Sequence, residues 1–315
     1  MEKKDLVILS PLTFVSGANS VSDSGAKPHF VDISDFDQNL DPVKVETELL
    51  KLKKKKKKVK AIIITDYAGN PANWIKFKKI SKKFNLVLIN DNCHAIGAKF
   101  KKKRNYACRY ADYVIQSFHA VKNITCGEGG AIYVKSKKNY DLLKELREHG
   151  FKKKNWNYSL NKIGFNLRLS DINCALGISQ LKRLNTIVYE RNKLAKNYNQ
   201  LLQEHNFIKV PKVLKHNYNS YHLYPIRIDF NKIKVKKNKF LLNLKKNYKI
   251  NLQIHYTPTY KFEYYKKNLN ISLKNFINTE KFYSETVSLP LFIGLKKKQQ
   301  SYIVNSILKC LKKKN

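Results

Sequence analysis

The sequence predicts an α/β fold with a mainly parallel sheet in a large first domain, followed by a smaller α+β domain. Short β-branched runs alternate with amphipathic stretches through the first half, which is typical of strands joined by crossover helices. Several runs are apolar on successive residues, as strands covered by helices on both faces are. From about residue 170 the apolar residues follow a helical period instead.

Six strands and two helices are predicted in the first half. The strands are expected at 6–9, 29–33, 61–65, 86–90, 113–116 and 131–134. Asp41 supplies an N-cap and Pro42 a first helical residue for one helix. The other helix, within 71–84, carries apolar residues at helical spacing: Trp74, Phe77, Ile80 and Phe84.

The second half begins with a helix that Ser170 caps, and a second long helix follows to about His205. Beyond Pro211 the predicted strands lie at 221–228 and 250–255, and the predicted helices at 276–283 and 299–311. We expect the domain boundary near Asn185. The large domain then spans 1–185, and the small C-terminal domain spans 186–315.

Composition indicates a globular, cytoplasmic protein. The 315 residues are 43% hydrophobic and 12% aromatic, and this length suggests two domains with a sizeable core. No apolar run approaches the roughly 18 residues that a membrane span requires, and no signal peptide precedes the first strand. The five cysteines show no Cys-x-x-Cys spacing, so we expect reduced thiols and no metal site.

The net charge of +40 raises the alternative of a basic nucleic-acid-binding protein. However, the lysine runs are spread between apolar segments along the whole chain, as in 53–58 and 152–154. A nucleic-acid footprint would concentrate on one element. The runs therefore indicate solvated loops and helix ends, although the positive field would attract an anionic, phosphate-bearing small molecule.

Polar side chains gather where predicted strands end. Asp91 and His94 follow the strand at 86–90, whereas Ser117 and Lys122 follow the strand at 113–116. In an open parallel sheet, ligands bind beyond the carboxyl ends of the strands. Taken singly, each residue has an ordinary structural explanation, such as a cap, a turn or a packed histidine.

Lys122 is the exception, because it stands alone in a weakly charged stretch of a chain that otherwise places lysine in solvent. A pocket that desolvates a lysine lowers its pKa and makes its amine nucleophilic. Such an amine forms a Schiff base with an aldehyde, and an acid against a pyridine nitrogen keeps that ring protonated. Lys122, Asp91 and Ser117 are thus the three residue types that pyridoxal phosphate requires.

At these residues the chain resembles the DegT/DnrJ/EryC1 family of pyridoxal-phosphate sugar aminotransferases. The stretch 117–132, Ser-Phe-His-Ala-Val-Lys-Asn-Ile-Thr-Cys-Gly-Glu-Gly-Gly-Ala-Ile, is similar to the family's lysine motif. Further blocks resemble the family in order, at 11–15, 25–32, 91–97, 164–172 and 175–177. The blocks at 254–258, 264–265 and 288–292 are most similar to the branch that makes UDP-4-amino-4,6-dideoxy-N-acetyl-L-altrosamine for pseudaminic acid.

The resemblance implies a fold type I transferase that forms a homodimer with its sites at the subunit interface. Lys122 would carry the cofactor and move the proton to and from the substrate carbon, whereas relatives that act as dehydratases carry histidine there. The other implied cofactor contacts are Asp91 at the pyridinium nitrogen, His94 near the ring's 3′ oxygen, Phe14 stacked on the ring, Ser117 at the phosphate, and Asn166 at the phosphate of the partner subunit. His255 and Tyr256 are the expected substrate contacts.

The leading hypothesis is transfer of an amino group from glutamate to the 4-keto carbon of a UDP-linked 4-keto-6-deoxy-N-acetylhexosamine. The family's Ser-Gly-Thr-Ala-Ala-Leu segment, which holds the cofactor phosphate, has no counterpart before Pro11, so we expect an N-terminally truncated chain. Asn90 also stands where the family usually has an acid. The alternatives are a catalytically inactive remnant or one half of a split enzyme and, more weakly, the nucleic-acid-binding protein.

Overall fold

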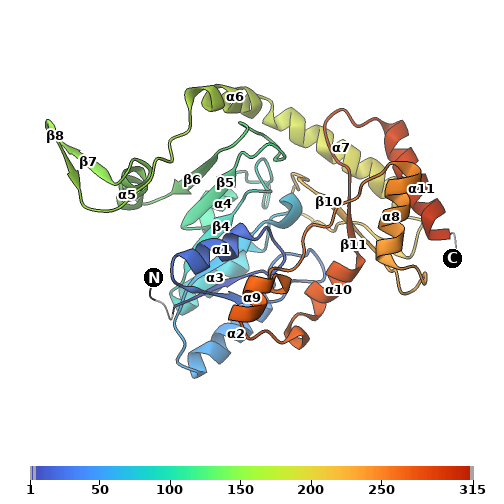
Figure 1. The fold of residues 1–315 in the computed structure, drawn as a ribbon, viewed down its shortest axis with the longest axis horizontal. Coiled ribbons are helices and arrows are strands. Elements are labelled where there is room, and N and C mark those ends of the chain that lie inside the picture. Colours follow the sequence, from blue (N-terminus) through green and yellow to red (C-terminus); the bar gives the residue numbers. More distant parts are fainter. Residues whose placement is uncertain (1, 3–4, 313–315) are drawn as a thin grey trace.

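The computed structural model describes residue 2 and residues 5–312, and its largest element is a six-stranded sheet (Figure 1). The strands lie in the order β2-β1-β3-β4-β5-β6, and every neighbouring pair is parallel except β5 and β6. This confirms the predicted α/β fold. The strands are β1 (Leu6–Leu9), β2 (Lys27–Phe30), β3 (Val59–Thr65), β4 (Val87–Asp91), β5 (Tyr113–Ser117) and β6 (Gly130–Val134).

Three helices cover one face of this sheet: α2 (Pro42–Lys54), α3 (Trp74–Phe84) and α4 (Tyr106–Tyr110). Helix α2 begins as predicted, because the Asp41 side chain accepts hydrogen bonds from the next two free backbone N–H groups, those of Val43 and Lys44. The apolar side chains of α3 that the sequence spaced for burial, including Trp74 and Phe77, are fully buried against this face.

The opposite face is covered at one side only. Helix α1 (Ser16–Asp23) packs there on β1 and β3 and buries Val7 and Ala61. Toward the β6 edge the same face becomes exposed, because Ile115 retains 36% of its accessible surface and Ile132 retains 52%. The apolar surface of β4, β5 and β6 on this side is therefore open within the described chain.

The second sheet is antiparallel, in the order β11-β10-β9, with β9 (Ile208–Lys209), β10 (Tyr224–Ile228) and β11 (Thr286–Leu289). Helices α7 (Leu184–Leu202), α8 (Lys237–Tyr248) and α11 (Lys297–Lys312) enclose it in a separate core. The strand predicted at 250–255 is wrong. Strand β11 takes the place beside β10 over four fully buried residues, and 250–255 keeps only one bridge, from Gln253 to Ser288.

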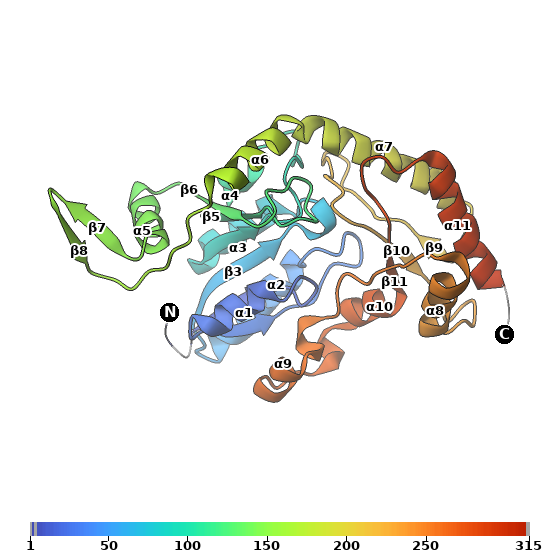
Figure 2. The same cartoon turned by 45° about the horizontal axis from the view of Figure 1, so that its top comes forward.

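A projecting arm joins the two sheets. Helix α5 (Lys137–Arg147) leads into the hairpin of β7 (Phe151–Lys154) and β8 (Asn157–Leu160), which extends away from the body in both views (Figures 1 and 2). Lysines 152–154 therefore lie in a strand and not in the loop that the charge run indicated. Helix α6 (Asp171–Lys182) follows and meets α7 at Arg183.

The remaining elements fill the space beside the first sheet. They are α9 (Glu263–Asn268), α10 (Ile277–Glu285) and the short turns η1 (Tyr67–Gly69), η2 (Thr259–Lys261) and η3 (Leu273–Asn275). Over residue 2 and residues 5–312, none of the helices combines the length and the apolar character that crossing a bilayer demands.

Asp32 joins α10 to the first sheet. Its buried carboxylate accepts hydrogen bonds from the backbone N–H groups of Asn278 and Thr279, at 3.1 and 2.9 Å, and from the Thr279 hydroxyl at 2.6 Å. Lys44 of α2 completes the cluster at 2.6 Å. Strand β2 ends at Phe30 and not at residue 33 as predicted, and Asp32 beyond the strand end contacts the first turn of α10 instead.

We expect Asp32→Ala to lower the free energy of unfolding by about 2–4 kcal/mol, because it leaves buried N–H donors without an acceptor. Urea unfolding followed by circular dichroism measures the change. The control is Asp23→Ala at an exposed carboxylate, which should change stability by less than about 0.5 kcal/mol. Equal stabilities for the two variants would contradict a structural role for Asp32.

Candidate active site

A cavity of about 940 Å³ lies where the two sheets approach each other. One part of its wall comes from the carboxyl ends of β4 and β5 and the loops that follow them, and another part comes from the chain beyond residue 190. The lining includes seven of the eight residues that the sequence singled out: Phe14, Asp91, His94, Ser117, Lys122, His255 and Tyr256. The cavity thus lies beyond the carboxyl ends of parallel strands, which is where ligands bind in open parallel sheets.

Asp91 is the last residue of β4, and its carboxylate is held on two sides. Oδ2 accepts a hydrogen bond from the Thr65 hydroxyl at 3.1 Å, because Thr65 pairs with Asp91 across β3 and β4. Oδ1 accepts a hydrogen bond from the backbone N–H of Cys93 at 3.2 Å. These contacts fix the side chain at the cavity wall.

Lys122 lies in a tight loop after β5. The loop is closed by three backbone hydrogen bonds, from Lys122 N–H to the His119 carbonyl, from Cys126 N–H to Phe118, and from Phe118 N–H to Gly129. Gly130 allows this closure, because a Cβ there would lie 2.8 Å from a backbone oxygen. Burial lowers the pKa of the Lys122 amine, and the nearby acids Cys93 and Asp91 oppose that shift.

Three histidines, His94, His222 and His255, share the cavity wall with Lys122 and lie close enough for its charge to act on them. His94 is 3% exposed, its Nε2 lies 3.1 Å from the Tyr256 hydroxyl, and its ring lies 4.5 Å from that of His222. Burial lowers the pKa of His94 and of His222 well below the usual value, and the positive charge of Lys122 acts in the same direction. His255 is placed by a 2.9 Å contact between Nδ1 and the Ser288 hydroxyl. The imidazoles are therefore neutral at pH 7.

Phe14 and Ser117 lie on the open part of the cavity. Phe14 is 57% exposed, and its ring meets that of Tyr256 edge to face with centroids 6.2 Å apart. Ser117 ends β5, and among the described residues its hydroxyl accepts only a long hydrogen bond, 3.4 Å from the His119 N–H. An aromatic face and a hydroxyl are thus available to a ligand.

Asn166, the eighth candidate, lies outside the cavity. It follows the β7–β8 hairpin and is exposed, and it forms an isolated bridge with Glu148. The sequence reasoning also missed lining residues, notably Cys93, His222 and Arg191. Cys93 stands inside the Asp91–His94 motif and could have been found there. His222 and Arg191 reach the cavity only through contacts between distant segments, so no local pattern marks them.

A buried carboxylate supports the end of β4 from beneath. Asp66 accepts hydrogen bonds from the Asn90 and Asn92 amides, at 3.2 and 2.9 Å, and from the Tyr106 hydroxyl at 2.7 Å. It also accepts from the backbone N–H of Ala72 and from the Trp74 indole. Burial raises the pKa of Asp66 to about 6, although these donors act to lower it. Asn90 and Asn92 flank Asp91, so this network holds the strand end in place.

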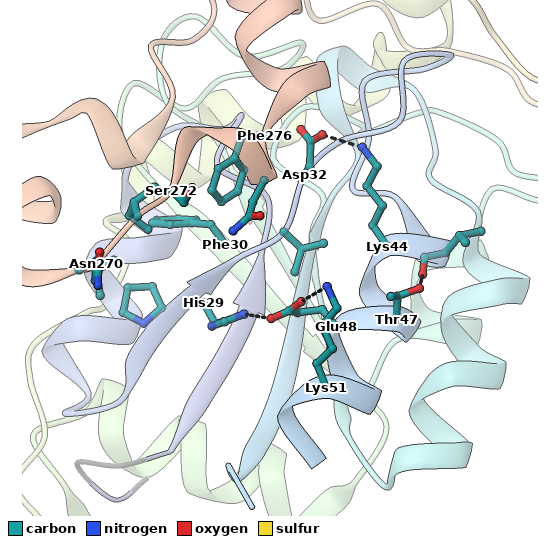
Figure 3. A pocket seen from close by; sticks show the side chains of 16 residues that line it. His29, Phe30, Asp32, Lys44, Thr47, Glu48, Lys51, Asn270, Ser272 and Phe276 are labelled. Carbon is teal, nitrogen blue, oxygen red and sulfur yellow. Dashed lines mark hydrogen bonds and ion pairs between the residues drawn. The ribbon is translucent and has the colours of Figure 1, made fainter. Parts of the chain in front are cut away.

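A second cavity, of about 350 Å³, lies between β2, α2 and the segment 269–276 (Figure 3). Its charged side chains are paired: Glu48 contacts Lys51 at 3.5 Å, and Lys44 contacts Asp32 at 2.6 Å, while His29 Nε2 lies 3.1 Å from Glu48. Since these groups are already paired, the polar groups of this cavity give no sign of a missing ligand, in contrast to the active-site cavity, where His94 Nδ1 is buried without a hydrogen-bond partner among the described residues.

The residues around Lys122 fit pyridoxal phosphate. They provide a partly desolvated amine for an aldehyde, a fixed carboxylate for a pyridine nitrogen and an exposed aromatic face for a ring. His94 Nδ1 is buried without a hydrogen-bond partner among the described residues, so this imidazole is free to meet a further polar group. The phosphate has the Ser117 hydroxyl within the same cavity.

Residues 1–308 match the DegT/DnrJ/EryC1/StrS aminotransferase family. A UDP-4-amino-4,6-dideoxy-N-acetyl-beta-L-altrosamine transaminase of Campylobacter jejuni is 36% identical over 313 residues, which are 99% of this chain and 80% of that protein. The transaminase of the same name from Helicobacter pylori is 32% identical over 305 residues, which are 96% of this chain and 78% of that protein.

Solved structures agree with the sequence matches. The Helicobacter pylori aminotransferase PseC, described as acting in the biosynthesis of pseudoaminic acid, superposes with a TM-score of 0.89 at 30% identity, covering 98% of this chain and 80% of PseC. The PMP form of the sugar aminotransferase Spr1654 from Streptococcus pneumoniae has a TM-score of 0.88 at 24% identity, covering 99% of this chain and 83% of that one. The second likeness concerns the fold alone.

The raised pKa of Asp66 predicts a pH-dependent stability. Between pH about 4 and about 6 the folded state binds a proton that the unfolded state has released, so the free energy of unfolding should fall as the pH rises through this window, by up to about 3 kcal/mol. Asp66→Asn cannot titrate, and urea unfolding of both proteins across the window isolates the effect. A stability difference between them that is independent of pH would contradict it.

Proposed function

The chain belongs to the DegT/DnrJ/EryC1/StrS aminotransferase family and uses pyridoxal phosphate, and we propose that it aminates the 4-keto carbon of a UDP-linked 4-keto-6-deoxy-N-acetylhexosamine with glutamate as the donor. The observation that carries the proposal is the convergence of Lys122, Asp91 and Phe14 on one cavity. The similar transaminases of Campylobacter jejuni and Helicobacter pylori point to the sugar. Neither the nucleic-acid-binding alternative nor the inactive remnant is supported by these relatives.

Different side chains of this cavity are proposed to bind different parts of the cofactor. When bound, pyridoxal phosphate supplies an aldehyde that condenses with amines and a protonated ring that withdraws electrons. In our proposal Lys122 holds the aldehyde, Asp91 faces the ring nitrogen, and Phe14 covers the ring. Ser117 donates its hydroxyl to the phosphate, and His94, neutral through burial, faces the ring oxygen.

Lys122 also moves the proton at its Nζ atom. Burial favours the neutral amine, which can accept a proton from a neighbouring carbon and return it to the next one. Burial lowers the pKa of His94 and of His222 well below the usual value, so these imidazoles are weak bases and do not compete for this proton at pH 7. His255 and Tyr256 line the same wall and are proposed to contact the sugar.

We propose that a second copy of this chain completes the site. The arm and α6 expose many apolar side chains, and no residue of α6 is buried within the described chain. Contiguous apolar surface of this kind marks an interface between proteins. Asn166 lies in this region and outside its own cavity, which supports its proposed contact with the phosphate in the partner. The exposed residues include Phe151, Trp156, Ile163, Leu167, Ile172 and Leu181.

We expect the protein mixed with pyridoxal phosphate to develop a visible absorbance band that Lys122→Ala lacks, because only the lysine amine condenses with the aldehyde. With glutamate and the UDP-4-keto sugar, mass spectrometry should detect the amino sugar, and Lys122→Ala should reduce its rate at least about a thousandfold. Lys76→Ala, at an exposed lysine of α3, is the control. Full activity of Lys122→Ala would contradict the role of the amine.

The homodimer is tested at Leu181 of α6, which is 54% exposed. We expect Leu181→Asp to weaken dimerisation about tenfold or more, because it places a charge in an apolar interface. Light scattering coupled to size-exclusion chromatography measures the mass at several concentrations. Leu273→Asp is matched in chemistry and exposure, at 52%, but lies in η3 away from the arm, and it should leave the mass unchanged. A monomeric wild-type protein would refute the proposed interface.

A further inference from the structure

Arg191 of α7 is a buried cation in the wall of the active-site cavity. It is 7% exposed, and its Nη1 donates hydrogen bonds to the carbonyl oxygens of Tyr221 and Leu291, both at 2.9 Å. A longer contact of 3.4 Å reaches the carbonyl of His222. Arg191 therefore joins two distant segments at the cavity: the chain leading into β10, and the turn after β11.

The charge of Arg191 is uncompensated. Among residue 2 and residues 5–312, no carboxylate forms an ion pair with it, whereas the other buried arginine, Arg227, pairs with Asp35 and Glu285. Burial lowers the pKa of Arg191 to about 10, so it still carries its positive charge at pH 7. Buried charges are ordinarily paired, so an unpaired guanidinium facing a ligand cavity indicates that the ligand brings the anion.

The free hydrogen-bonding capacity of this guanidinium is small. Nη1 is occupied by carbonyl oxygens, and Nε is buried without a partner among the described atoms. Nη2 is the nitrogen that remains for a ligand. One such nitrogen suits a single carboxylate group, whereas a diphosphate demands several cationic donors. Two other lining residues of the same cavity, Asn251 and Gln253, are neutral amides that can add hydrogen bonds to a carboxylate.

Arg191 and Lys122 line the same cavity, and histidine side chains connect the two positions. The charge of Arg191 acts on His222, whose ring centroid lies 4.5 Å from that of His94, and Lys122 acts electrostatically on both histidines. An amino acid whose amino group reaches Lys122 would thus direct its carboxylate along the two imidazoles toward Arg191.

We propose that Arg191 is the binding residue for a carboxylate group of the amino donor, which makes the wall of Arg191, Asn251 and Gln253 an amino-acid subsite. This rests on the proposed transamination. The proposal further distinguishes the donor from the sugar nucleotide, because one free guanidinium nitrogen suits a carboxylate and not a diphosphate.

The test uses the cofactor-loaded protein and two probes that cannot react, maleate for the carboxylate and UDP for the nucleotide. Isothermal titration calorimetry measures the affinity of each. We expect Arg191→Gln to weaken maleate binding about tenfold or more and to leave UDP binding unchanged, since one charge-assisted hydrogen bond is lost. Arg191→Lys keeps the charge and should cause an intermediate loss of maleate affinity. This variant provides the test if Arg191→Gln fails to fold.

The matched control is Arg227→Gln, which removes the paired buried arginine outside the cavity and should destabilise the protein without changing maleate affinity. The visible absorbance of the cofactor is recorded first for each protein, so a failure to bind pyridoxal phosphate is seen separately. Maleate affinity equal to wild type in Arg191→Gln and Arg191→Lys would overturn the subsite. If the variants lost affinity for UDP and kept their affinity for maleate, the subsite would also be overturned, because Arg191 would then bind the nucleotide diphosphate.

Discussion

The buried carboxylate of Asp66 is the constraint on which the candidate site depends. It accepts hydrogen bonds from the Ala72 N–H between η1 and α3, from the Trp74 indole of α3, from both asparagines that flank Asp91, and from Tyr106 of α4. Since all of these groups donate, the carboxylate connects the carboxyl end of β4 to the helices beneath the sheet. The cost of burying it appears as its raised pKa. Asp91 can therefore be held rigidly without any direct contact to a helix.

The pairing of strands then decides which side chains meet. Thr65, Asp91 and Ile115 stand side by side across β3, β4 and β5, and Ser117 follows two residues later on the same face. Within the described chain this face is exposed near β6, so the polar strand ends and the exposed apolar surface adjoin. A second copy placed on that surface would lie close to the cavity. Dimerisation and catalysis would therefore depend on each other.

The fold could be predicted largely from local patterns. The strands of the first sheet follow from apolar runs, and α2 and α3 from caps and helical spacing. Helix α8 was missed because Phe240 and Leu244 are its only buried side chains among many lysines. The predicted domain division near residue 185 remains a prediction, as do the roles of the individual site residues. Arg191 and His222 could not be found, because their positions depend on contacts across about 30 and 100 residues of chain that no local period encodes.

The charge of +40 has two different physical meanings in this molecule. Lysines 53–58 are exposed at and just beyond the end of α2, where water and salt screen them. Lys122 and Arg191 are partly or fully withdrawn from water, so their interactions are stronger and their pKa values are lowered. The cavity also contains Asp91 beside Lys122 but no acid beside Arg191 within the described residues. The positive surface attracts anions in general. In our proposal the unpaired guanidinium of Arg191 selects a carboxylate among them.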